Sequence, residues 1–100
     1  MQLHYLDFDY SDEDSGRGSF DAMASVLADR LPALRAEVDA VLQWAVREFG
    51  PAAAPGDEGD WDHDVQQTIE PGTPARTTLT LTISGSPAFC DAFREKFELA

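Results

Sequence analysis

The closely spaced acidic side chains are the most reactive feature of this sequence. Ten of the nineteen acids fall in two eight-residue windows, Asp7 to Asp14 (DFDYSDED) and Asp57 to Asp64 (DEGDWDHD), and neither window contains a Lys or Arg. Carboxylate oxygens spaced this closely can bind a divalent cation, or they can attract a basic protein. Acidic runs also occur as plain solvated surface, so the windows by themselves do not select a function.

A cation site would need acids from both windows to meet. Neither window matches the EF-hand loop, because Val65 follows the Asp60-x-Asp62-x-Asp64 run where the loop needs glycine. Pro71 also stands where the bidentate glutamate belongs. We therefore expect no cofactor, and we keep a Ca²⁺ or Mg²⁺ site as an alternative interpretation, on the four acids that alternate along two predicted strands: Asp7, Asp9, Asp62 and Asp64.

Other catalytic arrangements are poorly represented. His63 stands between two aspartates, but neighbours along a strand point to opposite faces, so this run does not form a proton relay. Cys90 is the single cysteine and has no partner at a defined spacing, and no Gly-x-Ser-x-Gly elbow occurs. Gly16 to Ser19 has no phosphate-binding pattern, and acids precede it. We predict that the protein is not an enzyme.

Composition limits the partners. Seven Lys plus Arg against nineteen acids give a net charge of -12, which opposes binding to nucleic acid or to anionic membranes. A hydrophobic content of 43% in 100 residues is typical of one folded domain, expected over 1–100. No long apolar run and no signal-peptide pattern is present, so a cytoplasmic location is the expectation.

Hydrophobic periodicity predicts the elements of this domain. Alternation indicates strands, spacing of three or four indicates helices, and Gly-Pro clusters indicate loops. Pro32 lies inside the longest helical pattern, so that helix is expected to kink there or to divide into two. The predicted elements are a strand over 3–10, a helix over 19–49, a loop over 50–59, strands over 60–70 and 76–84, and a helix over 86–97.

These elements predict an α+β fold in the order β-α-β-β-α, with a small antiparallel three-stranded sheet and both helices on one face. The order resembles a ferredoxin-like unit that lacks its last strand, a resemblance of topology that implies no function. The uncovered face would carry Leu3, Tyr5, the strand acids and the Thr78, Thr80 and Thr82 row.

The sequence favours a small, acidic, non-enzymatic protein that acts through protein contacts, either with itself as a homodimer or with a basic partner. Two alternatives remain open: a divalent-cation binding module, and a nucleic-acid mimic that inhibits a basic protein. The residues expected to contact a protein partner are eight of the ten window acids and two aromatic anchors: Tyr5, Asp7, Asp9, Asp12, Glu13, Asp14, Asp60, Trp61, Asp62 and Asp64.

Overall fold

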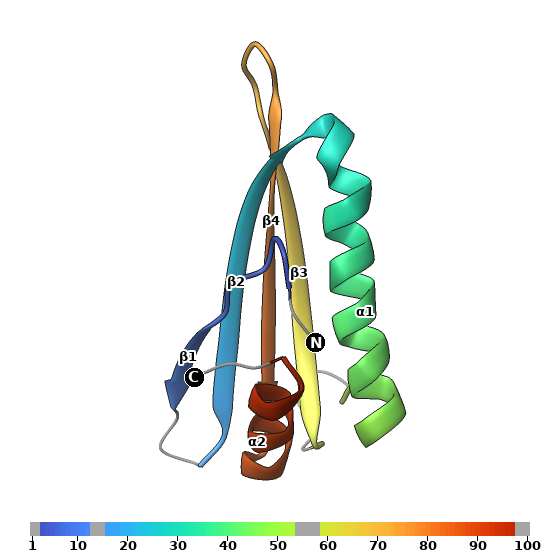
Figure 1. Cartoon of the computed structure of the whole chain (residues 1–100). Helices are drawn as coiled ribbons and strands as arrows, with labels where there is room; N and C mark the ends of the chain where they lie inside the picture. The colour runs from blue at the N-terminus through green and yellow to red at the C-terminus, as the bar shows by residue number, and fades with distance from the viewer. Residues whose placement is uncertain (1–2, 13–15, 54–58, 98–100) are drawn as a thin grey trace.

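A computed structural model describes residues 3–12, 16–53 and 59–97 and shows an α+β fold with one antiparallel sheet (Figure 1). The sheet has four strands in the order β1-β2-β4-β3. The predicted α+β class, antiparallel sheet, long helix and short C-terminal helix are confirmed, whereas the three-stranded sheet and the β-α-β-β-α order are wrong. The elements are β1 (Asp9–Asp12), β2 (Gly18–Leu27), a 3-10 turn (Ala28–Arg30), α1 (Leu31–Phe49), β3 (Trp61–Glu70), β4 (Arg76–Gly85) and α2 (Pro87–Lys96).

The largest correction concerns Gly18–Leu27, which forms the central strand β2 and not the first part of a helix. Its burial alternates strictly, with the side chains of Phe20, Ala22, Ala24 and Val26 buried and the residues between them exposed. Alanine and methionine favour helices, and the same segment also carries apolar residues at helical spacing. Pairing with β4 on one side and β1 on the other overrides that propensity.

Pro32 marks the beginning of α1 and neither kinks it nor separates two helices. The helix starts at Leu31, so the proline lies in the first turn, where its missing N–H has no intrahelical partner to lose. The helix then runs without interruption to Phe49 and ends at Gly50, which has a positive φ of 81°. The predicted helix over 19–49 is therefore too long by the length of β2 and the 3-10 turn.

The predicted strand over 3–10 is also mostly wrong, because pairing begins only at Asp9. The carboxylate of Glu37 on α1 holds the preceding segment by accepting three backbone N–H groups, at 2.9 Å from His4, 3.0 Å from Tyr5 and 2.8 Å from Leu6. These bonds orient the chain toward α1, so that Leu6 is buried at 5% exposure. Leu3 and Tyr5 also pack against the core and do not lie on the uncovered face.

The core lies between the sheet and the layer made by α1, α2 and residues 3–8 (Figure 1). Opposite each other on β2 and β4 are Phe20 with Ile83, Ala22 with Leu81 and Ala24 with Leu79. Helix α2 adds Phe89 and Phe93, both fully buried. The opposite surface, here the open face, carries the intervening side chains, among them Asp9, Asp21, Met23, Asp62, Asp64, Thr78, Thr80 and Thr82.

Gly85 is the point at which β4, α2 and the start of β3 come closest. A Cβ at this position would lie 2.4 Å from Cδ1 of Phe89 and 2.8 Å from the carbonyl oxygen of Asp60. We predict that Gly85→Ala lowers the free energy of unfolding by about 1–3 kcal/mol because the core cannot accept the extra atom without shifting. Urea denaturation measures this, with Ser84→Ala on the open face as a control expected to change stability by under about 0.5 kcal/mol. Equal stability of the two variants would contradict the packing argument.

Glu37 should determine whether residues 3–8 stay docked. Glu37→Gln removes the charge and one acceptor oxygen, so we expect faster hydrogen exchange at the His4, Tyr5 and Leu6 amides and a loss of roughly 1–2 kcal/mol of stability. The matched control is Glu48→Gln, the same change at an exposed position of the same helix. Unchanged exchange at those three amides would show that the carboxylate does not hold the segment.

Candidate functional site

The strand-borne acids of the two windows lie on opposite edge strands of the sheet. Asp9 on β1 is paired with Asp21, whereas Asp62 and Asp64 on β3 are paired with Ser84 and Thr82. Two central strands separate β1 from β3. The expectation that strand acids from both windows could act together is therefore not met by the strand order.

One row of the open face runs from Asp9 through Asp21 and Thr82 to Asp64. Neighbouring strands lie about 4.8 Å apart, so Asp9 and Asp64 are separated by about 14 Å, too far to share a cation. The hydroxyl of Thr82 donates a 2.8 Å hydrogen bond to Asp21. Asp7 is exposed in the segment before β1, and within the described residues no three His, Cys, Asp or Glu side chains are grouped to hold a metal.

The remaining predicted contact residues are scattered. Asp12 and Asp60 are exposed near opposite edges, while Glu13 and Asp14 lie outside the described residues. Tyr5 is half-buried against the core. Trp61, expected as a surface anchor, is instead 1% exposed, and its indole N–H donates a 2.9 Å hydrogen bond to the carbonyl of Gly50. Trp61 is thus a core residue that ties β3 to the end of α1.

The outer edge of β3 is long and exposed. Eight of its ten residues, His63 to Glu70, are exposed. Two flanking hydrogen bonds show which way the backbone groups of β3 point. The carbonyl oxygen of Asp60 accepts from the N–H of Ser86, just after β4, at 2.9 Å. The carbonyl oxygen of Trp61 accepts from the N–H of Ala53, on the side away from β4, also at 2.9 Å. In an antiparallel ladder both backbone groups of a residue point to the same side, and the side alternates. His63, Val65, Gln67 and Ile69 therefore direct their N–H and C=O groups away from β4.

One of these outward groups already has a partner. The N–H of His63 donates a 2.7 Å hydrogen bond to the carboxylate of Asp62, so this backbone donor at the start of the edge is already satisfied. For the other three residues, no described residue supplies an outward partner. We call these three, Val65, Gln67 and Ile69, the β3 edge.

A groove runs beside the β3 edge on the helix side of the sheet. It encloses about 200 Å³ between α1 and the last two strands, and its apolar lining comprises Val38, Leu42, Val65 and Leu79. The guanidinium of Arg35 crosses it and donates a hydrogen bond to the side-chain oxygen of Gln67. We call this the β3 groove. A second hollow of about 350 Å³ lies along α1, shares Asp39 and Leu42 with the groove, and is lined by α1 residues as far as Arg47.

The strand over 60–70 was expected from its alternation, but neither its position at the edge of the sheet nor the residues of the groove were predicted. The available signal was the apolar pair Leu42 and Val46, which stand four residues apart on one side of α1. Val65 and Ile69 have the same helix-side parity as Trp61 yet are 41% and 67% exposed. Their exposure results from the position of α1, which the alternation does not specify.

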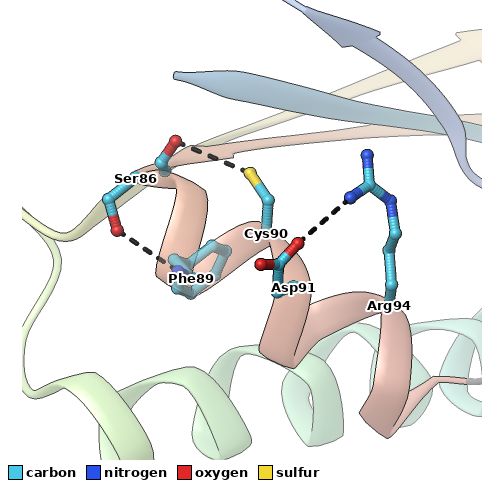
Figure 2. A network of polar contacts seen from close by, with 6 residues as sticks. Ser86, Phe89, Cys90, Asp91 and Arg94 are labelled. Carbon is cyan, nitrogen blue, oxygen red and sulfur yellow. Dashed lines mark hydrogen bonds and ion pairs between the residues drawn. The ribbon is translucent and has the colours of Figure 1, made fainter. Parts of the chain in front are cut away.

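The opposite edge, at β1, is only four residues long, and all four residues are exposed. Tyr10 packs on Phe20 at 4.9 Å between ring centroids, and the guanidinium of Arg94 lies 3.9 Å above the Tyr10 ring. Figure 2 shows Arg94 bonded to Asp91 at 3.4 Å, and Ser86 capping α2 by accepting from the N–H of Phe89. The pKa of Tyr10 is raised, chiefly by its contact with Asp12.

Comparison with known proteins adds no functional assignment: no protein-family model, curated protein or solved structure matches the chain. Among the helices of the described residues, none combines the length and the apolar character needed to span a membrane.

Cys90 is buried at the first turns of α2, where its thiol donates to the carbonyl of Gly85 at 3.6 Å (Figure 2). Burial is the main cause that raises the pKa of this thiol, because the low-dielectric core disfavours thiolate. The unfolded thiol ionises near pH 8.5, so the free energy of unfolding should fall as pH rises above about 8.5. Urea midpoints at about pH 7 and 9.5 measure this decline, and Cys90→Ala should make it shallower. An identical decline in both proteins would contradict the assignment.

Proposed function

We propose that this chain is a non-enzymatic protein-binding module in which the β3 edge accepts an extended segment of another protein as a fifth strand. The observation that carries the proposal is the β3 edge itself. Three alternate residues direct backbone donors and acceptors outward, next to a groove with an apolar lining. In strand addition the main-chain bonds provide affinity and the pockets beside the edge provide specificity.

The contrast between the two edges supports this proposal. Natural sheets commonly protect their edges with short strands, charged or bulky side chains, or a covering element. The β1 edge has such protection, being four residues long with Tyr10 and Arg94 packed over its inner side. Strand β3 is ten residues long, and beyond His63 only exposed side chains flank it. No described element covers the edge beyond His63, although Asp64 and Glu70 place charged side chains on its open face. An exposed edge of this length is consistent with a docking role.

The two alternative functions have weaker support. A cation module would use carboxylates that lie on opposite edges of the sheet. A nucleic-acid mimic would need a continuous acidic track, but Thr82 interrupts the row between Asp21 and Asp64. The self-association and basic-partner hypotheses both fit strand addition, since either a second copy or another protein could supply the strand.

Val65→Pro tests the proposal directly. Val65 directs its N–H outward, so proline removes a docking donor without removing a bond to β4, and proline is tolerated on edge strands. Peptides selected from a random seven-residue library on the wild-type protein should protect the Val65, Gln67 and Ile69 amides from hydrogen exchange. Their affinity should fall at least tenfold in Val65→Pro.

The matched control is Val65→Thr, which keeps the backbone donor and a β-branched side chain and should retain most of the affinity. Thermal denaturation should show that both variants remain folded. Peptides that bind Val65→Pro as tightly as the wild type, or a selection that yields no binder, would refute the strand-addition function.

A further inference from the structure

Building on the proposed strand addition, we infer that the segment bound at the β3 edge is a strand in which basic residues alternate with aliphatic ones. The inference rests on the two faces that such a strand would present. Side chains of an added strand lie on the same sheet face as the β3 residues directly opposite them, and they alternate between faces. The chemistry of each face beside β3 therefore specifies every second residue of the partner.

On the helix side, the added strand would meet the β3 groove. The β3 side chains that line it are Val65 and Gln67, with Leu42 on α1 across the groove. The charged residues of the lining are Arg35, which donates to Gln67, and Asp39. Leu79, 2% exposed, is the deepest of the apolar residues in this lining. A branched aliphatic side chain from the partner would remove the exposed part of Val65 from water, which is favourable in proportion to the apolar area covered.

On the open face, the added strand would meet carboxylates. The open-face positions of β3 are Asp62, Asp64, Gln66, Thr68 and Glu70, and none of them is basic. Asp62 uses Oδ1 to accept from the N–H of His63, and Asp64 uses Oδ2 to accept from the side-chain amide of Gln66 at 3.2 Å. Each carboxylate has a second oxygen with which a Lys or Arg of the partner can form a charge-assisted hydrogen bond.

A second copy of the chain fits the same edge less well. It would bring its own three acids of β3 to the open face, where β3 has no basic residue to offset them. Arg76, on β4 opposite Glu70, is basic and lies on this face, but its guanidinium already donates to the hydroxyl and the carbonyl oxygen of Ser25. Two molecules that each carry a net charge of -12 also repel one another as they approach. Charge complementarity therefore favours a basic segment over a homodimer at this edge.

The experiment uses three synthetic peptides with the full-length protein. The first alternates the two residue types, acetyl-Lys-Val-Lys-Val-Lys-Val-Thr-amide. The second has the same composition with the lysines in one block, and the third replaces each lysine by glutamate. Fluorescence anisotropy should show that the alternating basic peptide binds at least tenfold more tightly than either of the others. Its affinity should weaken as salt is raised, because exposed charges are screened.

Matched charge variants locate the contact. The double variant Asp62→Asn with Asp64→Asn should lower the affinity for the alternating basic peptide at least tenfold. Asp7→Asn with Asp9→Asn changes the net charge equally near the opposite edge and should have an effect of under about threefold, consistent with screening over more than a Debye length. The inference would be overturned if both double variants lost the same affinity for the alternating peptide, or if the block peptide bound as tightly as the alternating one. Either result would show that net charge alone explains the binding.

The failure of this inference can be told from failure of the proposed function. Binding of the acidic peptide that is lost in Val65→Pro would overturn the basic-partner chemistry and keep strand addition. If sedimentation shows that the wild type forms dimers and that Val65→Pro does not, a second copy of the chain is the occupant. That result would also overturn the basic-partner chemistry and keep strand addition. If no peptide protects the Val65 amide and no dimer forms, both the inference and strand addition fail.

Discussion

The ten-residue antiparallel pairing of β2 with β4 is the constraint on which the rest of this structure depends. It joins Gly18 to Gly85 at one end and Leu27 to Arg76 at the other, so it links the two halves of the chain. Both strands bury every second side chain toward the helices. A slip of one residue in either strand would turn its apolar row toward the open face, so burial specifies the register.

This pairing also decides where the charges lie. Because β4 is inserted between β2 and β3, the hairpin partner β3 becomes one edge and β1 becomes the other. The strand-borne parts of the two acidic windows are thereby held apart by two strands. That separation limits mutual repulsion in a chain with a net charge of -12, although Asp9 still stands directly opposite Asp21. The Thr82 hydroxyl donates to Asp21 on this crowded row.

The two edges acquire different surroundings from the same topology. At β1, α2 brings Arg94 over Tyr10 and covers the inner side of a short strand. At β3, α1 approaches through the Arg35 contact with Gln67 but leaves the apolar groove lined by Leu42 and Val65 accessible. The β3–β4 hairpin also extends beyond the start of α1 (Figure 1), which leaves Ile69 without helical cover. The accessible edge is thus a consequence of helix placement.

Local signals predicted the second half of the chain closely. The expected strands over 60–70 and 76–84 and the helix over 86–97 correspond to β3, β4 and α2 within one residue at each end, because strict alternation, the Pro-Gly turn and the Ser86 cap all act locally. The first half was predicted poorly. Residues 18–27 carry both a two-residue and a helical apolar period, and only pairing on both sides of the strand resolves that ambiguity.

Composition alone makes the chain acidic. The β3–β4 hairpin, the capped α2 and the apolar stripe of α1 follow from local sequence, since each depends on neighbours within a few residues. Tertiary structure decided that Pro32 begins a helix, that Glu37 holds the amides of residues 4 to 6, and that Trp61 is buried. It also decided that the acidic strands lie apart and that β3 is an accessible edge. These outcomes depend on contacts between residues far apart in the chain, and no local pattern of charge or hydrophobicity specifies which strands become neighbours.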